Sequence, residues 1–550
     1  MIKKWFKSGE PWIWLNASAV SISIIVVLGL LLVIAVKGLS HFWPAEIIQA
    51  ELVKGEQRTT LIGEITDKAD VPVQRLRDSG LEIETDKEVI SRSLIKVGNR
   101  DLLGSDFRWV VFPENTRIHY PKELTIIERR EWGNFYGYVK SISKNGEVIS
   151  TNGSTFEKLL ELVDESNQLH EQIRDIEKHE IGDINYQLEH LRLKKRKLEL
   201  DGITTKSAFD EIKQQEQALH ELYAELKKSL LKLYNKSTTY AVTAEIMNGR
   251  SISIPLAKIV RAYQPNKLGY FEKISIYFSR LGEFIFDEPR EANTEGGIFP
   301  AIFGTVLMVI LMAILVTPCG VITAIYLREY AKQGFLTRVI RIAVNNLAGV
   351  PSIVYGIFGL GFFIYFIGSE IDQIFYPEAL PAPTFGTPGL LWSSLTLAIL
   401  TVPVVIVATE EGLSRIPKSL REGSLALGAT KAETLWRIII PMATPAMMTG
   451  MILAIARAAG EVAPLMLVGV VKLAPSLPLD SSLPFLHLER KFMHLGFHIY
   501  DVGFQSPNVE AARPLVYATS FLLVLVIVVL NLSAIWIRNH LREKYRNLET

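Results

Sequence analysis

The stretch that decides the fold is REGSLALGATKAETLWRIIIPMATPAMMTGMILAIARAAGEVAP, residues 421–464. Its first half is polar, whereas the half after Pro441 is apolar for long enough to cross a lipid bilayer. This pattern predicts a helix-turn-helix loop that leads directly into a membrane-spanning helix. Arg457 and Glu461 lie in the apolar half, four residues apart, and would share one helix face. Because charge at membrane depth is energetically costly, we predict a functional site at this pair.

The chain as a whole combines a membrane part with a water-soluble part. Its 550 residues are 49% hydrophobic and 21% charged, with a net charge of +1. A near-zero net charge argues against nucleic acid as the main partner, because binding a phosphate backbone requires a basic surface. The single cysteine, Cys319, excludes a framework of disulfides within the chain.

The first apolar segment covers residues 12–36 and follows Lys3, Lys4 and Lys7. It is longer than the apolar core of a signal peptide, which is roughly 7–15 residues, so we predict an uncleaved membrane anchor. The lysines place the N-terminus in the cytoplasm by the positive-inside rule. Residues 1–37 would therefore form a cytoplasmic N-terminus and a first membrane span.

Residues 38–295 contain no further segment that is long and apolar enough to cross a bilayer. This block should lie opposite the N-terminus, which is the periplasm of a Gram-negative cell. Short alternating runs predict a β-rich domain built from residues 50–154 and 236–265. Residues 155–235, between them, carry a heptad pattern that predicts an inserted antiparallel coiled-coil hairpin. The seam residues are Ile184, Leu188, Leu191, Leu198, Ile212, Leu219, Leu222, Leu226 and Leu233. The pattern does not decide whether this insertion braces a binding protein, contacts the cell wall or holds a partner permease.

The segment at residues 273–287 is rich in aromatic residues at helical spacing. Two interpretations stay open. It could be an amphipathic helix in the membrane interface before the next span, or the last surface helix of the soluble domain.

Residues 296–550 are dominated by apolar runs. Five runs each exceed the roughly 20 residues needed to span a bilayer, so about six crossings are expected with the anchor. They cover approximately residues 298–326, 340–367, 388–409, 443–471 and 514–537. Lys and Arg gather in the loops that would be cytoplasmic, and residues 368–386, an external loop, have none. We therefore predict a mainly α membrane protein with an external α+β domain and both termini in the cytoplasm.

The loop at residues 415–441 resembles the EAA loop of ABC importer permeases, which docks an ATPase. The matching positions are Glu422, Gly428, Ile438 and Pro441, and the departures are Gly423, Ser424 and Ile440, where the motif usually has Ala, Ala and Leu. The replacements are small or aliphatic and leave the docking interpretation intact. A small residue such as Gly428 also lets another protein approach the backbone closely. The resemblance implies that this loop couples the chain to an ATPase.

Four further segments resemble the PstA family, the permease subunits of phosphate-specific ABC importers. They are GGIFPAIFGT from Gly296, YLREYA from Tyr326, GVPSIVYGIFGL from Gly349 and ARAAGEVAPL from Ala456. The resemblance covers residues 296–550 and leaves the external insertion unexplained. It implies a subunit that moves inorganic phosphate across the inner membrane into the cytoplasm, and it links Arg457 and Glu461 to transport.

The same resemblance implies the partners. They would be a homologous second permease (PstC-like), two ATP-binding subunits (PstB-like) and a periplasmic phosphate-binding protein (PstS-like). ATP and Mg would lie on the ATP-binding subunits, because the chain has no Gly-Lys dipeptide and hence no Walker A loop. We therefore predict a subunit without a catalytic site and without a cofactor of its own.

The chemistry of Arg457 and Glu461 suits a transported anion. A guanidinium offers several donors to phosphate oxygens, and a nearby carboxylate would keep the binding weak enough for release. A permanent ion pair that only rigidifies the helices is the alternative at this site.

Other interpretations also stay open. A permease for another oxyanion, such as sulfate, molybdate or phosphonate, would share the EAA loop. A membrane-anchored sensor with a periplasmic coiled coil fits the six crossings and the short C-terminal tail less well. His494 and His498 could bind a metal with Asp501, but two histidines without a clear third ligand are more often structural, so no metal site is predicted.

Overall fold

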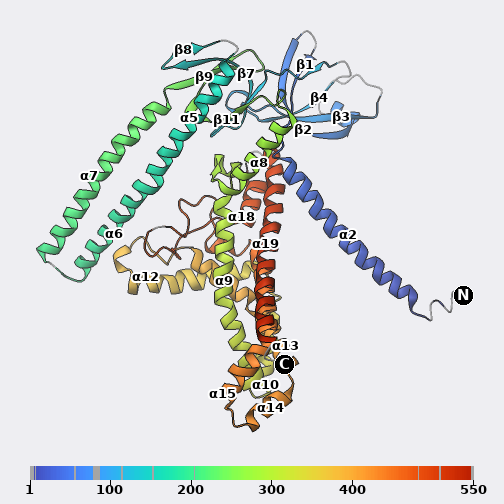
Figure 1. The fold of residues 1–550 in the computed structure, drawn as a ribbon, viewed down its shortest axis with the longest axis vertical. Coiled ribbons are helices and arrows are strands. Elements are labelled where there is room, and N and C mark those ends of the chain that lie inside the picture. The colour runs from blue at the N-terminus through green and yellow to red at the C-terminus, as the bar shows by residue number, and fades with distance from the viewer. Residues whose placement is uncertain are drawn as a thin grey trace. The chain divides into compact units, whose positions relative to one another are not determined.

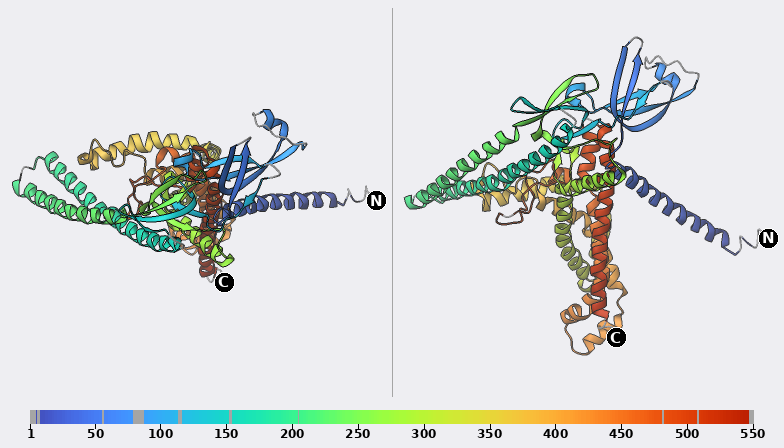
Figure 2. Two further views of the ribbon diagram at one scale, coloured as in Figure 1. Left: turned by 90° about the horizontal axis from the view of Figure 1, so that it is seen from above. Right: turned by 45° about the horizontal axis from the view of Figure 1, so that its top comes forward.

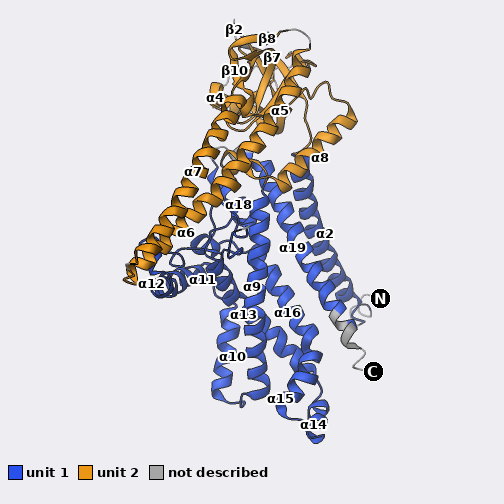
Figure 3. Cartoon of the chain, turned by 60° about the vertical axis from the view of Figure 1, so that its left-hand side comes forward, with its two compact units in different colours: residues 1–41, 298–550 blue, residues 42–297 orange. Residues whose placement is uncertain are grey.

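The computed structural model describes most of the chain and divides it into two compact units. The described residues are 5, 8–54, 57–78, 87–112, 116–151, 154–203, 205–480, 482–506 and 509–546. Lys3, Lys4 and Lys7 lie outside them. One unit comprises residues 1–41 and 298–550, and the other comprises residues 42–297 (Figure 3). We call them the membrane unit and the insertion unit. The predicted boundaries at 37/38 and 295/296 lie within a few residues of these divisions.

Six helices in the described part of the membrane unit are long and apolar enough to cross a bilayer. This confirms the predicted count of about six. Several of them contain a π-helical segment (η4, η5 or η7), and Figure 1 and Figure 3 together label their main parts. The six are α2 (Glu10–Ser40); α9 (Phe299–Ile325) with η4 (Tyr326–Tyr330); α11 (Ser352–Phe358) with η5 (Gly359–Gly368) and α12 (Ser369–Phe375); α13 (Leu390–Arg415); α15 (Lys431–Thr434) with η7 (Leu435–Ile439) and α16 (Ile440–Gly460); and α19 (Val509–Arg546).

Two of the predicted spans are wrong in their bounds. The run at residues 340–367 is not one helix, because α10 (Phe335–Leu347) ends before Gly349 and α11 begins only after Pro351. Proline lacks the N–H that would continue the preceding helix, and it favours a helix start. The run at residues 443–471 is also broken, since α16 ends at Gly460 and a separate short helix, α17 (Leu465–Val468), follows Pro464.

The core of the membrane unit forms around α13, which packs against α9 and α16. Glycines allow close approach at these crossings: a Cβ on Gly320 of α9 would lie 2.6 Å from a methyl of Val405, and one on Gly412 would lie 2.2 Å from Cβ of Ala446. In lipid the hydrophobic effect does not drive helices together, so their association depends on close packing. Small residues at the crossings allow the backbones to approach closely. α13 is therefore the central helix of this unit.

The insertion unit contains two antiparallel sheets, of which one has the strand order β4-β3-β2-β1-β5 and the other β10-β9-β7-β6-β11 with β8 beside β7. The strands of the first sheet are β1 (Ile47–Lys54), β2 (Gln57–Pro72), β3 (Val89–Lys96), β4 (Phe107–Val111) and β5 (Ile118–His119). Those of the second are β6 (Thr125–Arg129), β7 (Phe135–Lys144), β8 (Glu147–Ser150), β9 (Tyr240–Glu245), β10 (Ser251–Pro255) and β11 (Ile259–Tyr263). The strands before and after the hairpin thus share a sheet, since β9 pairs with β7.

A long helical hairpin leaves this second sheet (Figure 2). It consists of α5 (Thr155–Asp175), η1 (Ile176–Glu180), α6 (Ile181–Leu200) and α7 (Lys206–Ser237). α5 buries Leu159 and Val163 in the core of the sheet, whereas Ile184, Leu191 and Ile212 are buried along α6 and α7. The prediction that Leu222 lies in the seam is wrong, because its side chain is about half exposed. The helices left to name in this unit are α3 (Val73–Asp78), α4 (Arg100–Leu103) and α8 (Tyr270–Phe286), together with the 3-10 helices η2 (Leu256–Lys258) and η3 (Glu291–Asn293). The strands left to name are β12 (Pro289–Arg290) and β13 (Glu295–Gly296).

The contact between α2 and α19 within the membrane unit provides a first prediction. Gly38 is the buried residue of α2 in the described part of that helix, and a Cβ there would lie 2.8 Å from the backbone of Ala518. Gly38→Leu should therefore lower the stability of the purified full chain by about 1–3 kcal/mol through overpacking. Gly29→Leu is the control, because a Cβ at Gly29 meets no atom within 4 Å. Thermal unfolding in detergent would measure both, and equal melting temperatures would contradict the predicted contact.

Candidate functional site

The polar loop between α13 and α16 folds as the predicted helix-turn-helix. α14 (Lys418–Ala426) starts after Pro417, and Gly428 follows it with a left-handed φ of 87° that favours glycine. α15 then begins with a capping box, in which Thr430 Oγ1 accepts from the N–H of Glu433 at 3.2 Å and Glu433 accepts from the N–H of Thr430 at 2.8 Å. Local sequence signals thus fix both ends of the turn.

The predicted coupling residues do not all face outward. Glu422, Gly423 and Gly428 are exposed, and Ile438 and Pro441 are partly buried. Ser424 is buried, and its hydroxyl lies 2.8 Å from that of Thr434, so it joins α14 to α15. We call the helix-turn-helix loop between α13 and α16, residues 416–439, the elbow. The contact between the two hydroxyls joins its two helices.

Two exposed apolar residues on this loop were missed by the sequence analysis. Leu427 is 91% exposed and Trp436 is 71% exposed. Neither belongs to the EAA pattern. The signal that could have found Leu427 is a large apolar residue beside a turn glycine in a polar segment, and no comparable signal marks Trp436. Exposed apolar groups of this size on a rigid elbow are typical of a protein-binding surface.

The elbow is held by polar contacts to η4, the π-helical end of α9. Arg421 pairs with Glu329 at 3.0 Å, and their side chains are 18% and 12% exposed. Lys431 Nζ donates to the carbonyl of Glu329 at 2.5 Å and lies 4.5 Å from the ring centre of Tyr330. These residues line a small hollow between the elbow and η4. The YLREYA segment is therefore the part of α9 that holds the loop.

The elbow also continues directly into the core. Leu435 and Ile439 of η7 pack with Leu413 of α13, Ile325 of α9 and Met447 of α16. A displacement of the elbow would thus be transmitted to α9, α13 and α16 together, because packed side chains resist compression.

Arg457 and Glu461 are close together but do not share a helix. α16 ends at Gly460, and Glu461 has an extended backbone (φ −80°, ψ 134°), so the predicted common helix face is wrong. The Nε of Arg457 nevertheless lies 3.6 Å from Oε1 of Glu461, with the two side chains 33% and 21% exposed. At this distance the two side chains form an ion pair, but the atoms are too far apart for a hydrogen bond. The guanidinium is therefore loosely held.

The segment that contains this pair packs on the one that starts at Gly349. A Cβ on Gly356 would lie 2.7 Å from Cα of Pro464, and one on Gly359 would lie 2.9 Å from a methyl of Val468. The structure thus brings together two stretches, GVPSIVYGIFGL and ARAAGEVAPL, that lie about a hundred residues apart in the sequence. The glycines are required because the backbones approach too closely for a side chain.

The histidines of the last loop are buried within the membrane unit. His494 accepts from the N–H of Gly496 at 3.1 Å at the start of α18 (Leu495–Tyr500), and Asp501 pairs with Lys472 at 3.0 Å. No group of three or more potential metal ligands occurs among the described residues. The remaining elements of this unit are the π-helical η8 (Asp501–Gln505) and the 3-10 helix η6 (Pro377–Ala379).

Comparison with known proteins identifies the membrane unit. Residues 316–547 match the family described as binding-protein-dependent transport system inner membrane component. The probable ABC transporter permease protein YqgH of Bacillus subtilis (strain 168) is 33% identical over 196 residues, which are 35% of this chain and 59% of YqgH. The phosphate transport system permease protein PstA 1 of Mycobacterium tuberculosis (strain CDC 1551 / Oshkosh) is 35% identical over 250 residues, which are 44% of this chain and 71% of PstA 1. The chain belongs to this family, the permeases of ABC importers.

Among solved structures, a chain of the inward-facing MetNI methionine ABC transporter is similar to the permease over 44% of this chain and 94% of that chain. The identity is 17% and the TM-score 0.33. The family match confirms the predicted fold class and the resemblance to ABC importer permeases. It lies wholly within the membrane unit, so residues 42–297 are an addition to the family region.

The ion pair between the elbow and η4 gives the second prediction. Arg421→Ala should destabilise the permease by about 2 kcal/mol, because it leaves Glu329 largely buried without its cation. Arg415→Ala should change stability by less than about 0.5 kcal/mol, because the Arg415–Glu411 pair is exposed to solvent. Thermal unfolding of the purified full chain would compare the two variants. An equal effect would show that the elbow does not depend on the buried pair.

Proposed function

We propose that this permease carries inorganic phosphate into the cytoplasm as the membrane subunit of an ATP-driven importer. The observation that carries the proposal is the loosely held guanidinium of Arg457, 3.6 Å from Glu461, at the end of α16 in a segment of PstA type. A phosphate dianion could take the place of the carboxylate on the guanidinium, because both present two oxygens to the planar fork. Glu461 would reclaim Arg457 after release and so keep phosphate binding transient.

The similarity to PstA 1, which is named a phosphate transport system permease, favours phosphate over other oxyanions. The packing of Gly356 on Pro464, three residues after Glu461, joins two PstA-like segments and supports the proposal. A permease for sulfate, molybdate or phosphonate is the alternative with the same loop and the same kind of charge. The alternative and the proposal differ in the identity of the transported anion.

The remaining parts of the importer would be separate proteins. Two ATP-binding subunits would hold ATP and Mg and dock on the elbow, a second permease would complete the passage, and a periplasmic protein would deliver phosphate. In this arrangement the permease itself performs no catalysis. It would lie in the inner membrane with both termini in the cytoplasm and residues 42–297 in the periplasm, since Lys and Arg gather in the loops on the side of the elbow.

Removing the guanidinium tests the substrate site. Arg457→Ala should lower phosphate uptake by about tenfold or more, because a charge-assisted hydrogen bond contributes about 1.5–3 kcal/mol. Arg457→Lys should retain part of the uptake, since it keeps the charge without the fork. Arg538→Ala, near the exposed end of α19, is the control. Uptake of labelled phosphate and of labelled sulfate would be measured in cells that lack their own importers, at matched amounts of permease in the membrane.

The outcomes of this experiment separate the alternatives. Unchanged phosphate uptake in Arg457→Ala would assign the pair to structure only. Uptake of sulfate but not of phosphate by the unaltered importer would favour the other oxyanions.

The exposed leucine of the elbow tests the docking of the ATPase. Leu427→Asp should weaken copurification of the ATP-binding subunits by about thirtyfold, because a buried interface anchor contributes about 2 kcal/mol or more. It should leave membrane insertion intact, since the side chain contributes little to the fold at 91% exposure. Leu473→Asp, at a half-exposed leucine after α17, is the matched control. Equal copurification of the two variants would show that the ATPase docks elsewhere.

A further inference from the structure

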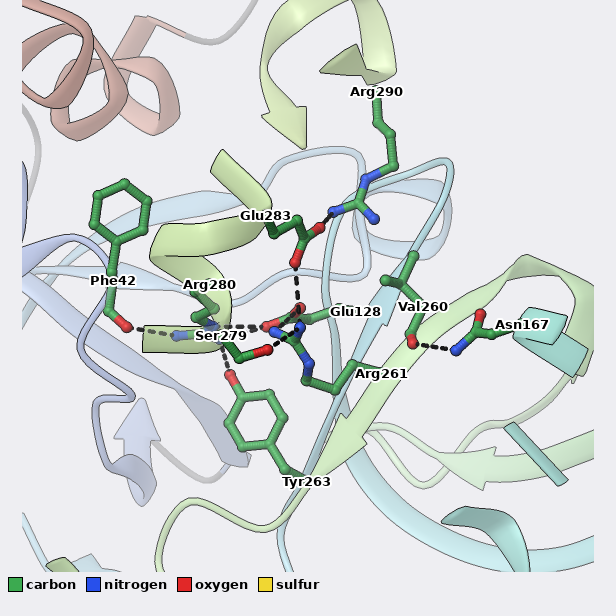
Figure 4. A network of polar contacts seen from close by, with 10 residues as sticks. All are labelled: Phe42, Glu128, Asn167, Val260, Arg261, Tyr263, Ser279, Arg280, Glu283 and Arg290. Carbon is green, nitrogen blue, oxygen red and sulfur yellow. Dashed lines mark hydrogen bonds and ion pairs between the residues drawn. The ribbon is translucent and has the colours of Figure 1, made fainter. Parts of the chain in front are cut away.

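The helix α8 of the insertion unit has its charged side turned inward. Arg280 points from α8 to Glu128 of β6 and to the hydroxyl of Tyr263 on β11 (Figure 4). Glu283, one turn on, pairs with Arg261 at 3.2 Å and also with Arg290. All of these groups are largely buried, so the polar side of the helix faces the protein rather than water.

The carboxylates of this inward network are each paired with guanidinium groups. Burial by itself would raise the pKa of Glu128, but Arg280 and Arg261 outweigh it and lower that pKa to about 2. Arg261 also contacts Glu128 at 3.4 Å, so two guanidinium groups share one carboxylate. Ionised groups in such a network hold α8 to the sheet in one orientation, because turning the helix would leave buried charges without partners.

An apolar strip runs along the whole length of α8, beside the exposed Ser275 and Ser279. Phe271 is 85% exposed and Phe278 is 63% exposed. Three partly buried aliphatic residues complete the strip at spacings of three and four. The strip consists of Phe271, Ile274, Phe278, Leu281 and Ile285, and the exposed Tyr270 and Phe286 flank it. A surface helix in water normally shows the reverse arrangement, with charges outward and apolar residues toward the core.

Two connections join α8 to the membrane spans, one through packing and one through a short linker. α2, the first span, ends at Ser40, and Phe42 and Trp43, which follow it closely, pack on α8. The ring centroids of Phe42 and Phe284 are 5.0 Å apart, and those of Trp43 and Tyr270 are 6.0 Å apart. At the C-terminal end of α8 only residues 287–298 separate it from α9, the second span. Trp and Tyr side chains gather at the boundary between lipid and water in membrane proteins, and they gather here.

We propose that α8 lies flat in the lipid–water interface of the membrane, with the strip from Phe271 to Ile285 in contact with lipid. The strip follows the helix over its whole length, so only a helix parallel to the bilayer surface can place every member of it in the interface. The charged network then serves as the rigid attachment of the insertion unit to this helix. Of the two interpretations that the sequence leaves open for residues 273–287, the proposal adopts the interfacial helix.

Lipid accessibility of the full chain tests this proposal. In a Cys319→Ala background, which removes the only cysteine, Phe278→Cys and Phe271→Cys would each carry an NBD fluorophore in proteoliposomes. Val148→Cys on β8 is the control, because Val148 is an equally exposed apolar residue on another surface of the same unit. Spin-labelled lipid should quench positions 271 and 278 at least about twofold more than position 148. Aqueous iodide should show the opposite order.

Two results would overturn the proposal. Quenching of positions 271 and 278 by iodide to the extent seen at position 148 would mean that the strip faces water. Protection of these positions from both iodide and lipid quencher would mean that a protein, such as a partner subunit or a second copy, covers the strip. Both residues are largely exposed, so neither replacement removes a core side chain, and retained thermal stability would verify that the labelled chains are folded.

Discussion

An ionised side chain that is held away from water needs a partner, and this constraint organises both units. In the membrane unit, Arg421 pairs with Glu329, and Arg341 with Glu410 at 3.2 Å. In the insertion unit, Arg280 and Arg261 share Glu128. Each pair joins elements that are distant in the sequence, so it selects one arrangement of helices that apolar packing alone would leave less defined. The weaker pair of Arg457 and Glu461 differs, because its separation exceeds hydrogen-bonding distance and leaves room for exchange.

The position of the elbow follows from the same constraint. Arg421 and Lys431 bind it to η4 at the end of α9, while η7 carries the chain without interruption into α16. A force on the elbow therefore has two routes inward, one through an ion pair and one through the backbone. Arg457 lies near the far end of α16, so a shift of α16 relative to α17 would change its distance from Glu461. That distance is the quantity on which the affinity for an anion would depend.

Sequence periodicity was sufficient to predict the architecture. It was insufficient to predict where helices are interrupted and which side of a helix is buried. The spans and strands could be predicted because hydropathy and alternation are local. The break at Gly349 and Pro351 was missed since hydropathy averages across it, and the end of α16 at Gly460 was missed for the same reason. Which side of α14 packs inward depends on Thr434, ten residues on, so the burial of Ser424 and the exposure of Leu427 could not be read locally.

The two exposed apolar surfaces for which contacts are proposed differ in their surroundings. Leu427 and Trp436 are isolated large side chains on a polar elbow, and Leu427 lies beside a turn glycine, which suits insertion into a pocket of a protein. The strip on α8 runs along a whole helix, is bordered by Tyr270 and Trp43, and has its charges on the opposite side. A continuous apolar strip on a helix also suits the flat surface of a bilayer, whereas an isolated leucine suits a pocket. The size and continuity of the two apolar surfaces are thus consistent with the proposed protein contact at the elbow and the proposed lipid contact at α8.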